Sequence, residues 1–446
     1  MADYRELGLN QFLQPINAPV SNNNNVSAYE FDSTYDRGAV GNAQLLSGAI
    51  NNAKVRNAYR AYNSVVSTIP GDGDTNDIQF AIDALNDTGE GGIILIRPGT
   101  YLPLTPLILY DNITLIGVDP INTIIDFSDA GNCSAGCIQI IGTSRTSTNT
   151  ISVTNGDATV TGSSTTFSSS GVVAGDLILI KGAKYEVLSV ASDTSLELTE
   201  TYKGNTESGV FFDIWSSKSN VNLYNLTISN GSSADTSGAD VVVNYADNTD
   251  IRNCIISNHT IGIDSLRTYD FKITNNTCNN NTTNGIDLSF QTATYVKDNV
   301  CNGNTSSGIE CDAGFSDHVN FILNNSCTSN GTYGIYVFVS SNYNLQGNSC
   351  VGNNSHGIFL EGSTYNILNN NICYSNGIDG INITNRISVQ SEYNIVLGNN
   401  CSGNDDDGIE LTSGADNNNV CHNVTQSNSG TNLVDSGLGN TVSDNT

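Results

Sequence analysis

Residues 299–312, NVCNGNTSSGIECD, carry the pattern that decides the fold. The pattern returns as NSCTSNGTYGIYVF at 325–338 and as NSCVGNNSHGIFLE at 348–361. Its Gly-Ile dipeptide recurs with steps of 23, 23, 26, 23, 23 and 28 residues, at Gly262, Gly285, Gly308, Gly334, Gly357, Gly380 and Gly408. A period of this length is the signature of stacked structural repeats.

Two further markers share the period. A cysteine precedes six of the Gly-Ile pairs by seven residues, from Cys278 to Cys401, and an asparagine follows each of these cysteines three residues later, from Asn281 to Asn404. Three short strands with their corners use up such a period at ~3.3 Å per residue, so we predict the turns of a β-solenoid. Turns stacked ~4.8 Å apart place equivalent residues above one another. We therefore expect ladders of hydrogen-bonded asparagines and a buried stack of thiols rather than disulfides.

The start of the solenoid is also recognisable. Asp77, Gln79, Ala81 and Ile82 fit a short amphipathic helix that caps the first turn, and the segment 91–101 fits the first strand and turn. With the repeats, these segments resemble the right-handed parallel β-helix of pectate lyases, polysaccharide depolymerases and viral tailspikes, over residues 70–140 and 215–446. The resemblance implies an all-β, single-stranded parallel β-helix, a homotrimer, and sites within or between subunits.

Two segments depart from the repeat. The repeats carry an Asn-x-Cys unit, from Asn276 and Cys278 to Asn419 and Cys421, that residues 148–213 lack. Residues 148–213 instead alternate strand and turn signals, and they resemble a small β module of phage tail and baseplate proteins. Residues 1–65 contain SNNNN and LLSGAINNAKV, the latter resembling a segment of phage tail-fibre N-termini. We therefore divide the chain into an attachment region (1–69), the β-helix start and cap (70–147), the inserted β module (148–214) and the repeat region (215–446).

Charge restricts the partners. The chain carries 44 Asp and Glu against 16 Lys and Arg, for a net charge of −28. Such a surface repels phosphate backbones and anionic lipids, which argues against a nucleic acid or a membrane as partner, while neutral or calcium-bridged glycans remain acceptable. The first residues show no signal-peptide pattern, and no segment has the length of an apolar membrane span. We expect synthesis in a host cytoplasm and export as part of a virion tail.

Alternation along the strand after each Gly-Ile predicts two outward columns of side chains. The first runs Asp264, Asp287, Glu310, Tyr336, Phe359, Asn382 and Glu410. The second runs Leu266, Ser289, Asp312, then Val337 or Phe338, Glu361, Thr384 and Thr412.

Carboxylates stacked at ~5–8 Å repel one another and raise a pKa, which suits acid–base work on a glycan. We predict Glu310, Asp312 and Asp287 as catalytic residues. For substrate binding we predict Tyr336, Phe338, Phe359, Glu361 and His318. His318 lies in a turn three residues longer than 23, and insertions in repeats often map to a binding face. Binding without cleavage, and an acidic column that serves only solubility, remain open.

We expect no metal ligands and no cofactor. Asp405, Asp406 and Asp407 with Asn404 leave calcium open, although the loop lacks EF-hand spacing. Cys133 and Cys137 have no histidine or second cysteine pair nearby in the sequence, which disfavours zinc.

Three functions follow. The main prediction is a tailspike or tail-fibre protein that binds host surface polysaccharide and contacts other tail proteins through its N-terminal region. The alternatives are a polysaccharide depolymerase, acting as lyase or glycoside hydrolase, and an adhesion protein without enzymatic activity.

Overall fold

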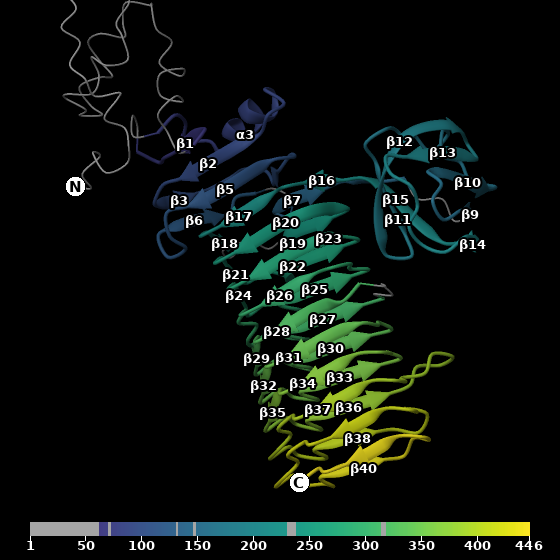
Figure 1. The fold of residues 1–446 in the computed structure, drawn as a ribbon. Coiled ribbons are helices and arrows are strands. Elements are labelled where there is room, and N and C mark those ends of the chain that lie inside the picture. Colours follow the sequence, from purple (N-terminus) through teal and green to yellow (C-terminus); the bar gives the residue numbers. More distant parts are fainter. Residues whose placement is uncertain (1–61, 70–72, 131–132, 146–148, 230–237, 314–317) are drawn as a thin grey trace, which may run out of the picture. The chain divides into compact units, whose positions relative to one another are not determined.

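The computed structural model describes residues 62–69, 73–130, 133–145, 149–229, 238–313 and 318–446. Val65–Thr446 forms one compact unit, in which successive turns stack one upon the next (Figure 1). The predicted attachment region lies outside the described residues except for 62–69. In the described part of the chain, no helix is long and apolar enough to cross a membrane.

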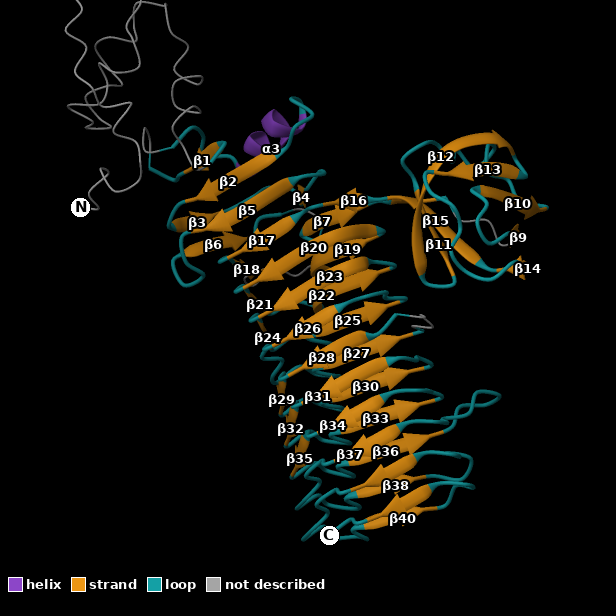
Figure 2. Cartoon of the chain, viewed as in Figure 1, coloured by secondary structure: helices purple, strands orange, loops and turns teal. Residues whose placement is uncertain are grey.

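Three parallel sheets form the faces of the solenoid (Figure 2), and we name them A, B and C. Sheet A contains β1 (Ser64–Val66), β2 (Gly92–Ile96), β5 (Ile113–Gly117), β16 (Lys218–Ser219), β17 (Asn222–Tyr224), β20 (Ala246–Arg252), β23 (Tyr269–Thr274), β26 (Tyr295–Lys297), β28 (Asn320–Leu323), β31 (Tyr343–Gln346), β34 (Ile367–Asn369), β37 (Ile395–Leu397), β39 (Asn419–Cys421) and β41 (Thr441–Ser443).

Sheet B is formed in two pieces, which isolated bridges through Val300 connect. The first piece contains β3 (Gly99–Tyr101), β6 (Thr123–Asp126), β18 (Thr227–Ser229), β21 (Ile255–Ser257) and β24 (Thr277–Asn279), and the second contains β29 (Ser326–Thr328), β32 (Ser349–Val351) and β35 (Ile372–Tyr374).

Sheet C contains the seven strands at the Gly-Ile pairs, together with three earlier strands and one later strand. They are β4 (Leu107–Ile108), β7 (Ile138–Ile141), β19 (Ala239–Asn244), β22 (Ile261–Leu266), β25 (Ile286–Ser289), β27 (Ile309–Asp312), β30 (Ile335–Phe338), β33 (Ile358–Glu361), β36 (Ile381–Thr384), β38 (Ile409–Leu411) and β40 (Leu433–Asp435). The all-β parallel solenoid predicted from the period is confirmed.

Between β7 and β16 the chain forms a separate eight-stranded antiparallel sheet with its own apolar core. Its strands are β8 (Thr143–Ser144), β9 (Thr150–Val153), β10 (Thr159–Ser163), β11 (Leu177–Ile180), β12 (Ala183–Ser192), β13 (Ser195–Leu198), β14 (Glu207–Val210) and β15 (Phe212–Ser216). An inserted β module therefore interrupts the solenoid, as the loss of the Asn-x-Cys unit indicates.

The single described helix, α3 (Ile78–Asn86), covers the first turn. The side chain of Asp77 caps it by accepting the backbone N–H of Phe80 at 3.1 Å. Ile78, Ala81 and Ile82 are buried and join the apolar core of the solenoid. The helix thus shields an end at which apolar side chains would otherwise meet water.

Asparagine ladders hold the corners of the turns. In the first ladder Nδ2 of each residue donates to Oδ1 of the next at 2.9–3.1 Å, through Asn276, Asn299, Asn325, Asn348, Asn371, Asn399, Asn423 and Asn445. A second ladder repeats this at 3.0–3.1 Å through Asn281, Asn304, Asn330, Asn353, Asn376, Asn404 and Asn428. Each Oδ1 also accepts the backbone N–H of the preceding ladder residue, as Asn348 does from Asn325 at 2.9 Å. Buried amides are thereby fully paired only when the turns stay in register.

Cysteine and glycine fill the space beside the ladders. All eleven cysteines are free, and ten of them are buried. A Cβ on Gly308 would lie 2.7 Å from the carbonyl oxygen of Gly334 and 2.9 Å from Cβ of Cys327. Because those contacts are closer than packing tolerates, the Gly-Ile position excludes side chains while the neighbouring thiol fills the remaining volume.

Substitution Asn348→Ala should destabilise the solenoid by about 2–5 kcal/mol, because it removes the acceptor of two buried donors of Asn325. The exposed Asn354 of the same turn provides the control, and Asn354→Ala should cost less than ~0.5 kcal/mol. Urea unfolding followed by circular dichroism measures both. Equal stability of the two variants would contradict the ladder account.

The thiol stack makes a second prediction. In the native protein only the half-buried Cys421 should react with a water-soluble disulfide reagent, whereas all eleven thiols should react after unfolding. A colorimetric thiol titration with and without denaturant gives both counts. Fewer than eleven thiols in denaturant without reductant would indicate disulfides.

Candidate functional site

Strand pairing places the predicted acidic column on the outer face of sheet C. Asp264 pairs with Asp287, Asp287 with Glu310, Glu310 with Tyr336, and Tyr336 with Phe359. The second column runs Ser289, Asp312, Phe338 and Glu361, so Phe338 rather than Val337 is the outward residue. Val337 is buried. The predicted residues therefore share one face of the solenoid, which we call the sheet C face. They are Asp287, Glu310, Asp312, Tyr336, Phe338, Phe359 and Glu361.

Asn284 joins the two central carboxylates. Its Nδ2 donates to Oδ2 of Asp287 at 2.9 Å and to Oε2 of Glu310 at 3.0 Å. The two acceptor oxygens therefore lie within about 6 Å of each other. Asn284 is buried and stands just before Gly285, so its amide is fixed by the corner of the turn.

Burial and mutual repulsion shift these carboxyl groups. Burial, followed by the charge of Glu310, raises the pKa of Asp287 to about 7. Burial also raises the pKa of Glu310, against the hydrogen bond from Asn284. The pKa of Asp312 is raised by burial and lowered in part by Arg386. Near neutral pH the column can therefore hold a protonated acid beside an ionised carboxylate, which acid–base catalysis requires.

An aromatic cluster continues the face below Glu310. The rings of Tyr336 and Phe359 stack with centroids 5.2 Å apart and an interplanar angle of 13°. Tyr333 packs 4.9 Å from each of them, and its ring is parallel to that of His356 at 5.8 Å. All four rings are partly exposed. They offer a flat apolar surface of the kind on which sugar rings stack.

Two polar groups flank the rings. The hydroxyl of Tyr336 donates to Oε2 of Glu361 at 2.5 Å. The guanidinium carbon of Arg386 lies 4.1 Å from the ring centroid of Phe338. Arg386 comes from the turn that is five residues longer than 23, so this insertion reaches the sheet C face.

The ring contact of His318 is with a residue of sheet A. His318 follows the turn between β27 and β28 and packs edge to face on Tyr269 of sheet A, with centroids 5.9 Å apart. Its predicted role in substrate binding gains no support from this position.

A second polar cluster lies below the rings. His356 Nδ1 is 3.1 Å from Oδ2 of Asp379, and Nδ2 of Asn382 donates to Asp379 at 2.8 Å and to Glu410 at 2.6 Å. Burial alone would raise the pKa of Asp379, but the hydrogen bonds from His356 and Asn382 hold it below its ordinary value. Oxygens of Asp379, Asp407 and Glu410 lie within 4.8 Å of one another.

The sequence analysis missed Asn284, Tyr333, His356 and Arg386. Asn284, Tyr333 and His356 each stand directly before a Gly-Ile pair, at a position whose residue type varies from turn to turn, and this variation was a usable signal. Arg386 belongs to an insertion, whose direction no period determines.

Two family models match parts of the chain, and one of them describes the fold seen here. The model described as "Right handed beta helix region" matches residues 313–446, and that described as "Periplasmic copper-binding protein (NosD)" matches 157–345. No curated protein matches the chain.

Among solved structures, the A-module of the mannuronan C-5 epimerase AlgE4 of Azotobacter vinelandii is similar with 18% identity and a TM-score of 0.52, over 82% of this chain and 94% of that one. The AlgE6 A-module of the same organism shows 16% identity and a TM-score of 0.45, over 81% and 94%. The catalytic unit of a GH87 alpha-1,3-glucanase from Streptomyces thermodiastaticus shows 13% identity and a TM-score of 0.44, over 82% and 64%. The chain is a right-handed parallel β-helix.

Asp287 makes stability depend on pH. Its folded pKa of about 7 lies above the value of 3.8 for a free Asp, so the folded state holds the proton more tightly and its stability falls as pH rises from about 4 to 7. Asp287→Asn should raise the melting temperature above pH 7, and the difference from the wild type should shrink as pH falls towards 5.

Asp405→Asn, at an exposed corner, is the control and should show no such trend. Differential scanning calorimetry across the pH range measures all three proteins. A pH-independent effect of Asp287→Asn would contradict the shifted pKa.

Proposed function

We propose that the protein binds a polysaccharide along the sheet C face and hydrolyses it with Asp287 and Glu310. The observation that carries the proposal is the carboxylate pair held by one amide of Asn284, directly above the rings of Tyr336 and Phe359. Acid groups with a short separation beside a stacking surface are the parts that glycoside cleavage needs.

Each carboxyl group has a separate role. Asp287, with its raised pKa, donates a proton to the glycosidic oxygen as the bond to the anomeric carbon breaks. Glu310, ionised, attacks the anomeric carbon and forms a glycosyl ester, which water then hydrolyses while Asp287 takes back the proton. A separation within about 6 Å agrees with the ~5–5.5 Å typical of this two-step retaining route. Asn284 orients both groups.

The charge of the chain favours a neutral glycan. Asp264, Asp287, Glu310 and Asp312 lie above the rings, and the acidic cluster of Asp379 lies below them. A polyuronate would meet these charges, and abstraction of its C5 proton, the lyase or epimerase route, would need cations to neutralise the acid group. The epimerases named above share the fold with this chain, and we propose a different substrate class.

The test compares release of reducing ends from neutral polysaccharides, polyuronates and amino-sugar polymers. We expect cleavage of a neutral polymer, with Glu310→Gln and Asp287→Asn each lowering the rate about 10²–10⁴-fold. Glu392→Gln, in the long turn of Arg386, is the matched control and should keep the wild-type rate. Wild-type rates in both carboxylate variants would overturn the assignment of the pair.

Binding is tested separately from cleavage. Phe359→Ala should weaken binding of the same polymer about tenfold, since a stacked ring contributes ~0.5–1.5 kcal/mol. Tyr365→Ala, which removes an aromatic ring that stacks on Tyr393 in the turn before β34, should leave binding unchanged. Affinity electrophoresis in polymer-containing gels measures both variants, and equal retardation would contradict a glycan on the sheet C face.

A second candidate is glycan binding by a virion tail protein, with or without cleavage. The inserted β8–β15 module and its resemblance to phage tail modules favour it. Virion location, contacts with other tail proteins, cytoplasmic synthesis and the homotrimer stay predictions, as does any use of calcium. Mass measurement of the full chain in solution, together with immunodetection in purified particles, tests them: a trimer found in particles supports this candidate, and a monomer absent from particles contradicts it.

A further inference from the structure

One corner near the start of the repeat region departs from the pattern at three positions, which are Cys137, Asp240 and His259. Val241 pairs with Ile138 in one neighbouring strand and with Ile263 in the other. Asp240 and Cys137, one residue earlier, therefore stand in the column that Gly262 occupies in the next turn. Where later turns exclude any side chain, these two turns carry a carboxylate and a thiol.

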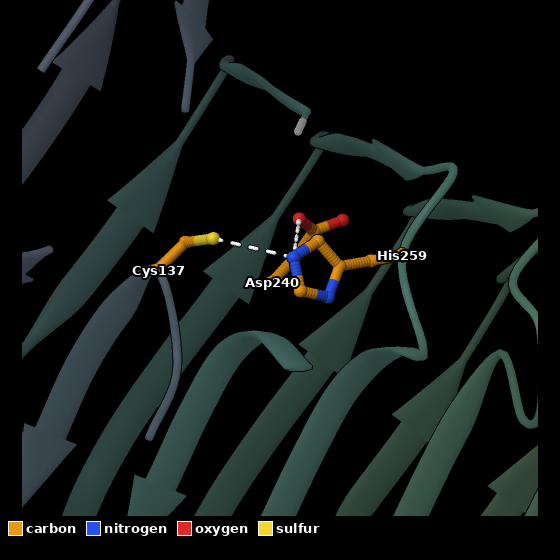
Figure 3. A group of neighbouring side chains, drawn as sticks. All are labelled: Cys137, Asp240 and His259. Carbon is orange, nitrogen blue, oxygen red and sulfur yellow. Dashed lines mark hydrogen bonds and ion pairs between the residues drawn. The ribbon is translucent and has the colours of Figure 1, made fainter. Parts of the chain in front are cut away.

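The geometry of Gly262 shows where those side chains point. A Cβ on Gly262 would lie 3.1 Å from Nδ2 of Asn281 and 3.3 Å from Cβ of Cys278, so the column faces the second asparagine ladder. His259 occupies the first place of that ladder, since its backbone N–H donates to Oδ1 of Asn281 at 3.2 Å. The imidazole of His259 thus replaces a ladder amide at the point where Asp240 and Cys137 enter the corner (Figure 3).

The three side chains converge on one point. Nε2 of His259 lies 3.4 Å from Sγ of Cys137 and 3.8 Å from Oδ1 of Asp240, and the three atoms lie within 4.8 Å of one another. Around a tetrahedral zinc ion, bond lengths of ~2.0–2.3 Å separate sulfur from nitrogen by about 3.5 Å and nitrogen from oxygen by about 3.3 Å. The observed separations are close to these values.

The other ring nitrogen fixes the orientation of the imidazole. Nδ1 of His259 hydrogen-bonds to the carbonyl oxygen of Gly238, so this nitrogen carries the proton and Nε2 presents its lone pair to the thiol and the carboxylate. A backbone carbonyl on the second nitrogen is the usual support of a metal-ligating histidine.

Asp240 needs a partner that the described residues do not supply. It is 0% exposed, as are Cys137 and His259, and neither of its oxygens has a hydrogen bond within the described part of the chain. A buried carboxyl group without a hydrogen bond destabilises the folded state, and a bound cation removes that cost.

We propose that Cys137, Asp240 and His259 form a structural zinc site inside the solenoid wall. One sulfur, one nitrogen and one oxygen ligand occupy three of the four positions of a tetrahedral Zn²⁺ ion, which accepts all three ligand types. Because the ligands are enclosed, the ion enters as the chain folds, and its binding energy becomes folding energy. The site joins β7, β19 and the start of the ladder across the interruption caused by the inserted module.

The experiment uses the full chain, refolded from denaturant with added Zn²⁺ or with chelator, followed by removal of free metal and elemental analysis by mass spectrometry. We expect about one zinc ion per refolded chain, and a higher melting temperature with zinc than with chelator. Refolding with Co²⁺ should give a thiolate-to-cobalt charge-transfer band and the intense visible bands of a tetrahedral ion. Wild-type protein that retains no zinc and shows no cobalt bands overturns the proposal.

Variants assign the ligands. Cys137→Ser should abolish the charge-transfer band, and Asp240→Asn should weaken zinc binding at least about tenfold. Asp240→Asn keeps the shape of the neutral acid, so it should fold in chelator as the wild type does and lose only the stabilisation by zinc. His422→Gln and Cys421→Ser, which alter partly exposed side chains near the C-terminus, are the controls and should bind zinc normally. An unchanged zinc content in Asp240→Asn overturns the ligand set, whether or not Cys137→Ser folds.

Discussion

The stacking of side-chain amides between turns is the constraint on which the rest of the structure depends. Each ladder Asn satisfies its own amide and a backbone N–H of its neighbour only when equivalent residues lie directly above one another, as in Asn325 and Asn348. A slip of one residue would leave buried donors without acceptors along the whole corner. Register along sheet C follows, and with it the vertical alignment of Asp287, Glu310, Tyr336 and Phe359.

The same constraint explains how an acidic site can persist. Charges that repel one another at rung spacing would separate in a flexible loop, but the strands on which Asp287 and Glu310 stand cannot move apart without breaking the ladders. Asn284 then offsets part of the repulsion with two hydrogen bonds from one nitrogen. The cost that remains appears as the raised pKa of Asp287, which is the property that its proposed role as an acid requires.

The regularity of the repeat decides which parts of the structure the sequence predicts and which parts it does not. Wherever the period is regular, a position in the repeat determines an environment, and the columns, the first two ladders and the free thiols were predictable from it. The capping helix was predictable from the resemblance of residues 77–82 to the caps of such solenoids. A third ladder, Asn366–Asn394–Asn418, was missed because Tyr343 takes its place in an earlier turn.

Where the period breaks, the sequence loses its predictive value. Cys137 and Asp240 are separated in the sequence by the inserted module, so the column that they share is hidden, and no partner of Cys137 stands near it in the sequence. Arg386 and His318 stand in long turns, whose paths are determined by local packing. The departures from the repeat are nonetheless informative, because each places a side chain that can bind a ligand or a proton where the regular turn has only a structural residue.

A crystal structure of the Glu310→Gln variant with a bound oligosaccharide of the cleaved polymer tests the central claim most directly. The account predicts sugar rings on Tyr336 and Phe359, with a glycosidic oxygen within hydrogen-bond distance of Asp287 and an anomeric carbon facing residue 310. An oligosaccharide bound on sheet A or sheet B, or on the sheet C face with its glycosidic bonds away from Asp287, would contradict it.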